Sequence, residues 1–137
     1  MERTFAAIKP DAFAAGHAGE ILARIYRERF RVVGLKKLHL SQEEAAGFYC
    51  VHRDKPFFAD LADFMSSGSC LFMVLEASGA IRKWRELMGA TNPAEAAVGT
   101  LRRDYGTSIG RNAVHGSDAP ETAAFEIGYF FAGLELI

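Results

Sequence analysis

The order of strand-like and helix-like stretches is the feature that most constrains how this chain folds. Short apolar runs of strand length occupy residues 3–9, 31–40, 70–76 and the neighbourhood of Val114, and the length and apolar content of the run at 70–76 predict a central strand. Apolar side chains recur at helical spacing within residues 18–29, 56–65, 81–88 and 119–131, and the first of these stripes ends with Tyr26. Shorter helices are expected at residues 41–49, where Ser41 and Glu44 form a capping box, and after Asn92. Few short strands with segregated helices are typical of an α+β sandwich, in which helices pack on an antiparallel sheet.

The chain is expected to form one domain. Its 137 residues suffice for a hydrophobic core, no repeat or linker interrupts them, and half of them are hydrophobic. No apolar run approaches the roughly 20 residues that a bilayer crossing needs, and the start lacks the basic and then apolar segments of a signal peptide. The two cysteines, Cys50 and Cys70, have no metal-ligand spacing. Together these features favour a soluble protein of the cytoplasm without a membrane partner.

Residues 110–118 carry the clearest chemical signal. An apolar run ends at His115, Gly116 follows, and a helix is predicted to start directly afterwards, with Asp118 as its N-cap and Pro120 in its first turn. A histidine at such a junction is expected to be partly exposed, fixed in position and close to the positive end of a helix dipole. Neutral imidazole has a lone pair near pH 7, so it can attack phosphorus without a separate general base. A histidine considered alone is more often a structural residue, so the surrounding segments must indicate whether His115 is catalytic.

The segment around His115 resembles the active-site signature of the nucleoside diphosphate kinases. Four further segments match that family in the same order and at similar spacings: Ile8-Lys9-Pro10-Asp11, Lys55-Pro56-Phe57-Phe58, Gly89-Ala90-Thr91-Asn92-Pro93 and Gly99-Thr100-Leu101-Arg102. The five segments lie within a match from Glu2 to about Phe131, which is nearly the whole chain. The short apolar end of the chain resembles the bacterial branch of the family.

The resemblance implies a fold, an activity and partners. The fold is a ferredoxin-like sandwich with a four-stranded antiparallel sheet and helices packed on it, in a single domain over residues 1–137. The activity is transfer of the γ-phosphoryl group from nucleoside triphosphates such as ATP to nucleoside diphosphates. It follows a ping-pong mechanism through a phosphohistidine on His115, with broad tolerance for the base. Mg²⁺ is the implied cofactor, and the implied assembly is a homo-oligomer, either a tetramer or a hexamer built from dimers.

Glu126 is the expected partner of the histidine. On the last predicted helix it lies among Ala123, Ile127 and Phe130, and a carboxylate on such an apolar flank needs a hydrogen-bond partner. A bond to His115, either directly or through Ser117, would satisfy it and fix the orientation of the ring. The family assigns this positioning role to the matching glutamate and serine. The alternative is a surface glutamate at the edge of the apolar stripe.

The resemblance also implies a set of nucleotide-binding residues. Those that match phosphate-contacting positions of the family are Lys9, Tyr49, Arg85, Thr91 and Arg102, and Asn112 matches a position that contacts the ribose and Lys9. Lys9 is in addition expected to take part in catalysis. Two local patterns support the set: Asn92 can cap the next short helix and leave the Thr91 hydroxyl free, and Arg102 follows a small Gly-Thr turn from which its guanidinium could reach phosphate. Taken alone, a tyrosine is more often a packing residue and a single arginine is more often solvated.

Phe57 is expected to bind the base. It falls beside the apolar stripe of its helix, so its ring is free to stack on any base, although core packing is an equal alternative for a phenylalanine considered alone. The predicted site also requires a bend in the backbone between Asn112 and His115. A strictly extended strand places Asn112 and His115 on opposite faces, so the backbone between them must bend if both serve one site.

Composition narrows the remaining possibilities. The net charge is −1, which does not favour binding to nucleic acid. The chain has neither a P-loop motif nor a kinase glycine-rich loop, and no acidic cluster, so no protein metal site is expected and Mg²⁺ would be carried by the nucleotide phosphates. Three rival functions stay open: a binding module without turnover, a nucleic-acid role alongside catalysis, and a histidine carrier that phosphorylates a protein.

Four positions depart from the family pattern. Arg103 stands where a small residue is usual, Ser69 replaces a proline, Ala77 replaces a common glycine, and Phe125 lies where charged residues are common. None of them is a predicted catalytic position.

Overall fold

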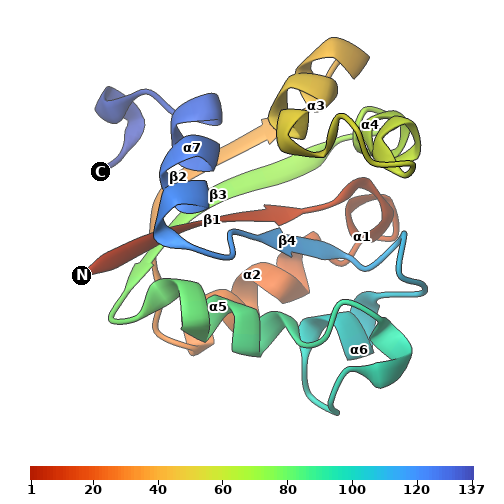
Figure 1. Ribbon diagram of the computed structural model, residues 1–137. Helices are drawn as coiled ribbons and strands as arrows, with labels where there is room; N and C mark the ends of the chain where they lie inside the picture. Colours follow the sequence, from red (N-terminus) through yellow and green to blue (C-terminus); the bar gives the residue numbers. More distant parts are fainter.

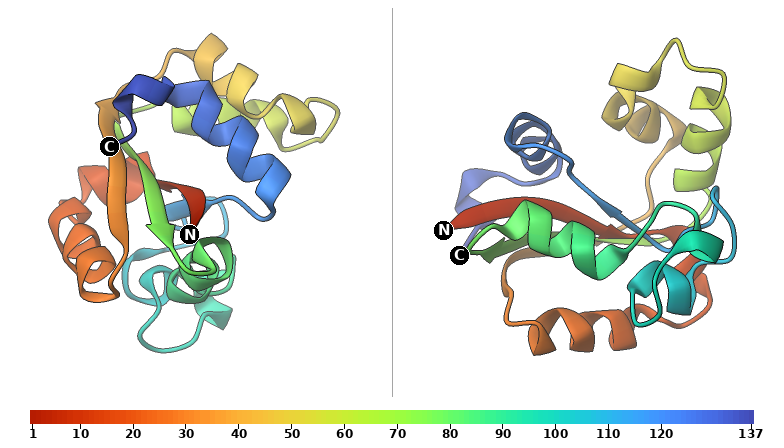
Figure 2. Two further views of the ribbon diagram at one scale, coloured as in Figure 1. Left: turned by 90° about the vertical axis from the view of Figure 1, so that its left-hand side faces the viewer. Right: turned by 60° about the horizontal axis from the view of Figure 1, so that its bottom comes forward.

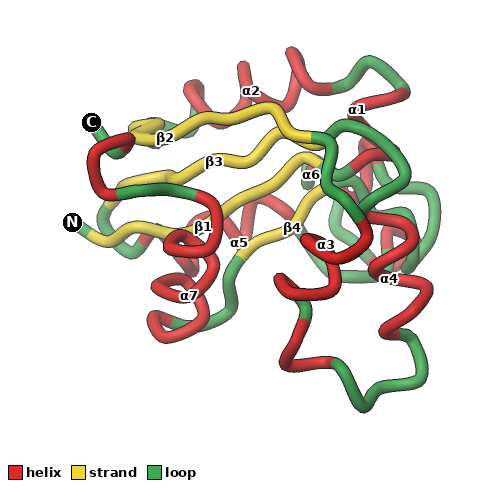
Figure 3. The backbone as a smooth tube through the Cα atoms, turned by 90° about the horizontal axis from the view of Figure 1, so that it is seen from above, coloured by secondary structure: helices red, strands yellow, loops and turns green.

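The computed structural model describes residues 1–137, which form one four-stranded antiparallel sheet in the order β2-β3-β1-β4. The strands are β1 (Glu2–Ile8), β2 (Arg31–Leu38), β3 (Cys70–Ala77) and β4 (Val114–Gly116). β3 pairs with both β1 and β2, so the prediction of a central strand at this position is confirmed. The architecture is the expected ferredoxin-like sandwich, and Figure 3 shows its strands side by side beneath the helices of one face.

Helices cover both faces of the sheet. On the upper face, as drawn in Figure 1, lie α3 (Gln42–Phe48), α4 (Phe58–Met65) and α7 (Pro120–Phe130). On the lower face lie α2 (Ala18–Arg27), α5 (Ala80–Met88) and α6 (Leu101–Tyr105). The short helix α1 (Pro10–Ala14) directly follows β1, and three short 3-10 turns occupy Cys50–His52, Pro93–Glu95 and Gly133–Glu135. None of these helices combines the length and apolar character that a membrane crossing requires.

The core has two halves, one on each face of the sheet, because side chains alternate along each strand. On β1, Phe5 and Ala7 belong to the upper cluster, whereas Ala6 and Ile8 belong to the lower one. All four are fully buried, which explains why the strand reads as a continuous apolar run rather than as an alternating pattern. Figure 2 shows α2 and α5 on one side of the sheet and α7, α3 and α4 on the other.

Most predicted boundaries agree with the structure to within two residues, and one predicted cap is wrong. The capping box of Ser41 and Glu44 is present. Helix α7, however, begins at Pro120, and its N-cap is Ala119 instead of the predicted Asp118. Proline fixes its own φ and lacks an N–H, so it occupies the first position of the helix. The Thr122 hydroxyl accepts the N–H group of Ala119 at 3.0 Å, so it takes over the capping function.

Two further differences concern helices. Tyr26 was expected on the apolar stripe of α2 but is 58% exposed, because the buried stripe of this helix is narrow and is centred on Ile21 and Ile25. Helices α1 and α6 were not predicted. Each has only five residues, which is too short for an apolar periodicity to show.

Candidate active site

His115 lies on β4 and faces the upper side of the sheet. Its partner on β1 is Ala7, and its ring packs against Phe48 with 5.5 Å between the ring centroids. On the other side of the strand, the Trp84 indole N–H donates to the main-chain oxygen of His115 at 3.1 Å. A Cβ atom on Gly116 would overlap the Trp84 indole, so this position requires glycine. Packing below the sheet therefore fixes the backbone that carries the histidine.

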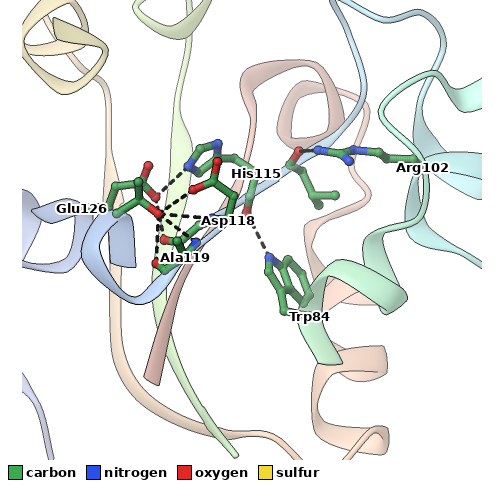
Figure 4. Close-up of polar contacts among 9 residues, drawn as sticks. Trp84, Arg102, His115, Asp118, Ala119 and Glu126 are labelled. Atoms are coloured by element: carbon green, nitrogen blue, oxygen red, sulfur yellow. Dashed lines mark hydrogen bonds and ion pairs between the residues drawn. The ribbon is translucent and has the colours of Figure 1, made fainter. Parts of the chain in front are cut away.

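The histidine ring is held by a carboxylate. His115 Nε2 lies 3.0 Å from Glu126 Oε1, and the Ser117 hydroxyl donates to the same oxygen at 2.7 Å. The side chains of His115 and Glu126 are only 18% and 15% exposed. The predicted contact between His115 and Glu126 is therefore direct (Figure 4). Ser117 binds the carboxylate instead of bridging it to the ring. A carboxylate beside Nε2 assigns the proton of the neutral ring to that nitrogen and leaves the lone pair on Nδ1.

Lys9 occupies the same side of the sheet. It lies two residues beyond Ala7, the partner of His115, and alternation along the chain gives both residues the same face. Its Nζ donates to Asn112 Oδ1 at 2.9 Å, and Asn112 Nδ2 in turn donates to the main-chain oxygen of Thr91 at 3.0 Å. Three predicted residues from distant parts of the chain are thereby joined in one hydrogen-bonded chain.

The bend that the sequence required is located at Ala113. This residue has φ of +73°, and the Val114 N–H donates to the Asn112 oxygen at 2.9 Å, a γ-turn with positive φ. Ala113 and Val114 are both members of the lower core cluster, which a regular strand would not allow for neighbouring residues. The turn therefore breaks the alternation, and the side chains of Asn112 and His115 both lie on the side of Lys9.

Arg102 is buried and already engaged. Its two terminal nitrogens donate to the main-chain oxygens of Gly89 and Val114, each at 3.0 Å, while its Nε is buried without a hydrogen-bond partner. The flexible Gly-Thr turn expected before it is the start of α6, where the Thr100 hydroxyl caps the helix. Arg85 is exposed on α5 and borders a separate surface cavity, but it lies close enough to Arg102 for the two charges to interact.

Burial and like charge shift the pKa values of the cations. The pKa of Lys9 is lowered from its ordinary 10.5 to about 8, first by burial and then by the neighbouring charge of Arg102, while Asp11 acts in the opposite direction. The pKa of Arg102 is lowered to about 10 by burial and by Arg85. The site thus holds two cations at close range with little solvent, an arrangement that favours an anionic ligand.

Tyr49 lies beside the histidine in the upper core. Its ring meets the His115 ring edge-on at 6.2 Å, and its hydroxyl is buried with no hydrogen-bond partner. Burial, together with the nearby Glu126 carboxylate, raises the pKa of this phenol well above its usual range. The hydroxyl is therefore a neutral donor that no protein group uses.

A cleft of about 820 Å³ opens beside Lys9. Phe57, residues 60, 61, 63 and 64 of α4 and Ser67 line one part of it, and Thr91 and residues 109–112 line the other. Phe57 is 48% exposed, so core packing, the alternative for this residue, is excluded. His115, Tyr49, Arg85 and Arg102 do not line the cleft. No group of three or more histidine, cysteine, aspartate or glutamate side chains is arranged to hold a metal ion.

One residue of the site was missed by the sequence analysis. The carboxylate of Asp11 accepts the N–H group of Ala113 at 3.0 Å, across 102 positions of sequence. Asp11 belongs to a motif that was noted, but nothing in the sequence around it indicates a partner so far along the chain.

Comparisons with known proteins agree with this geometry. The family model for nucleoside diphosphate kinase matches residues 2–136. The nucleoside diphosphate kinase of Syntrophotalea carbinolica is 77% identical over 137 residues, which is the full length of both chains. The solved nucleoside diphosphate kinase of Aquifex aeolicus has a TM-score of 0.98 at 45% identity, over 99% of each chain. That of Halobacterium salinarum, in complex with CDP, has a TM-score of 0.95 at 42% identity, over 99% of this chain and 91% of the other. From its sequence and its fold alike, the chain belongs to the nucleoside diphosphate kinase family.

Proposed function

We propose that this protein transfers the γ-phosphoryl group of a nucleoside triphosphate to a nucleoside diphosphate in two steps, through a phosphohistidine on His115. The observation that carries the proposal is the contact of 3.0 Å between His115 Nε2 and Glu126 Oε1. It leaves Nδ1 as the nitrogen with a free lone pair, and it supplies a negative charge on the far side of the ring.

In the first step, Nδ1 of His115 attacks the γ-phosphorus of the bound triphosphate. The N–P bond forms as the bond from phosphorus to the bridging oxygen breaks, and the electron pair of that bond leaves with the nucleoside diphosphate. The ring then carries positive charge, which the Glu126 carboxylate stabilises through the Nε2 proton. In the second step the terminal oxygen of another diphosphate attacks the same phosphorus, and the N–P electrons return to Nδ1.

Positioning and positive charge do most of the work in phosphoryl transfer, because charge spreads over the oxygens of the transferring group. Lys9 and Arg102 are the proposed cations that contact those oxygens. Tyr49 and Thr91 are the proposed neutral hydrogen-bond donors, and the exposed Arg85 is the proposed cation at the solvent side of the phosphate site. The unpartnered Nε–H group of Arg102 and the unpartnered Tyr49 hydroxyl support these assignments. Asn112, which already holds Lys9, is proposed to contact the ribose as well.

Broad base tolerance is proposed from the cleft beside Lys9. Its exposed aromatic side chain, Phe57, offers a stacking surface, and stacking favours any base by about 1–3 kcal/mol. The related Halobacterium salinarum enzyme binds CDP, which supports a diphosphate site for this chain.

Since the protein shows no ligand set for a resident metal ion, Mg²⁺ is proposed to arrive on the nucleotide phosphates, where it would neutralise charge. A cytoplasmic homo-oligomer remains our proposal for the assembly.

The test is a phosphoryl exchange assay with γ-labelled ATP and GDP. Wild type is expected to form a base-stable, acid-labile protein adduct that GDP removes as labelled GTP. His115→Ala should form no adduct and lose at least about three orders of magnitude in turnover. The matched control is His39→Ala, which removes an exposed histidine whose ring is hydrogen-bonded to the main-chain oxygen of Ser66.

Two outcomes would contradict the proposal. An adduct on the His115→Ala protein would place the phosphoryl group on another residue. An adduct that forms normally in wild type but fails to pass to GDP would instead favour a histidine carrier that phosphorylates a protein.

A further inference from the structure

Asp11 joins two parts of the active site that are distant in sequence. It lies in the first turn of α1, directly after Lys9 and Pro10. Its Oδ2 accepts the N–H group of Ala113 at 3.0 Å. Its other oxygen, Oδ1, is buried and has no hydrogen-bond partner. One carboxylate therefore contacts the γ-turn before β4 and lies close to the lysine before α1.

The turn at Ala113 needs such support. An alanine with φ of +73° is in the left-handed region, where its Cβ crowds the following carbonyl group, so this conformation is disfavoured for any residue other than glycine. The main-chain groups on both sides of Ala113 are held: its N–H by Asp11, and its oxygen by the Lys9 N–H at 2.8 Å. Strained conformations persist where the surroundings fix them in this way.

We infer that Asp11 is a positioning residue for phosphoryl transfer, whose carboxylate holds Ala113 in the left-handed turn that brings Asn112 and His115 to the same side as Lys9. The inference rests on the proposed function, since it concerns the geometry of the same site. Without the bond from Asp11, the turn can relax toward an extended strand, which would rotate the Asn112 side chain away from Lys9.

The charge of Asp11 has a second effect. The charged or titratable groups that act on the Lys9 ammonium are Arg102, Asp11 and Cys70. Burial and Arg102 lower the pKa of Lys9, whereas Asp11 raises it. Asp11 thus helps to keep Lys9 protonated near neutral pH, in addition to holding the turn.

Four variants separate the two effects: Asp11→Ala, Asp11→Asn, Ala113→Gly, and Asp11→Ala combined with Ala113→Gly. Asp11→Ala removes the bond and the charge, and its kcat per phosphorylatable subunit is expected to fall about ten-fold. Glycine adopts positive φ freely, so the double variant should recover at least about half of the loss in log kcat, which is a rise of about three-fold over Asp11→Ala. Asp11→Asn keeps an oxygen that can accept from Ala113, so its kcat should stay close to wild type while the alkaline limb of its pH–rate profile moves to lower pH.

The control is Glu43→Ala, which removes an exposed first-turn carboxylate from helix α3 and should leave kcat unchanged. Labelling with γ-labelled ATP counts the competent subunits. A variant that merely folds poorly therefore forms less adduct, but its kcat per labelled subunit stays unchanged. Normal kcat in Asp11→Ala, or no recovery in the double variant, would overturn the inference. The dissociation constant for ADP is measured for all variants, because it reports the placement of Lys9 and Asn112 independently of turnover. If wild type forms no adduct, the proposed function fails, while an ADP affinity that falls in Asp11→Ala and recovers in the double variant would still support the role of Asp11.

Discussion

The two faces of the sheet perform different tasks. Below the sheet, helices α2 and α5 and the strands bury a cluster of hydrophobic side chains that includes Trp84. Above it, the aromatic cluster around Phe5 and Phe48 borders the polar groups of the site, among them His115 and the buried Lys9. The lower face contributes mainly stability, with the buried Arg102 of α6 as its exception, whereas the upper face accepts unfavourable burial to place most of the reactive groups. Substitutions on the two faces should therefore have opposite effects on stability and activity.

The largest effect is expected from Trp84→Ala on the lower face. Trp84 is fully buried, packs edge-on against Phe30 at 6.1 Å, and fits against Gly116. Loss of so large a side chain should lower the free energy of unfolding by about 3–5 kcal/mol in denaturant titrations. Trp84→Phe, which keeps a ring, should cost clearly less. The upper-face control is Phe57→Ala, expected to leave stability nearly unchanged while it weakens nucleotide binding. Equal destabilisation by Phe57→Ala and Trp84→Ala would contradict the proposed difference in stability between the two faces.

Lys9→Met on the upper face should act in the opposite direction. The pKa of Lys9 is about 8 in the folded protein against an ordinary 10.5, so folding disfavours its protonated form. Below pH 8 this penalty is complete, on the order of 3 kcal/mol, and it disappears as the pH rises from about 8 to about 10.5. Wild type should therefore gain stability over that interval. Lys9→Met should be more stable than wild type at pH 7 and lack this gain, and its turnover should fall by about 10²–10³.

The activity of wild type should follow the same titration with the reverse sign. Deprotonation of Lys9 removes the charge that faces the phosphates, so kcat/KM is expected to fall as the pH rises through about 8. Lys9→Arg retains its charge over this range, so whatever activity it has should lack that alkaline decline. A wild-type profile that stays flat to pH 10 would show that Lys9 does not need its charge.

The features that could be predicted from the sequence are those that depend on local patterns. Periodicity and caps are local signals, so the strands, the longer helices and the capping box at Ser41 could be placed in advance. The partnership of His115 with Glu126 was also accessible, because a carboxylate on an apolar helix flank needs a nearby partner. Both predictions rest on residues that are close in sequence or on a resemblance that covers nearly the whole chain.

The features that could not be predicted depend on contacts between distant residues. The positive φ of Ala113 has no signal of its own, since alanine ordinarily avoids that region and the supporting bond comes from Asp11. Likewise, the main-chain oxygens that bind Arg102 are brought together only when the loop after α5 meets β4. A pattern can identify a reactive side chain, but the backbone that holds it is fixed by tertiary packing.

The smallest effect, and the sharpest test of the upper face, is expected from Glu126→Gln. Both His115 and Ser117 bind the same oxygen, Oε1, so a glutamine oxygen can accept both hydrogen bonds and only the charge is lost. The ring should keep its orientation, and the free energy of unfolding should change by less than about 1 kcal/mol. Because the carboxylate stabilises the positive ring only as the N–P bond forms, the rate of adduct formation should fall about ten-fold while nucleotide affinity is retained. Stopped-flow measurement of that first step separates the two quantities. An unchanged rate would mean that Glu126 only orients the ring, whereas a large loss of stability would mean that this carboxylate belongs to the core like its apolar neighbours.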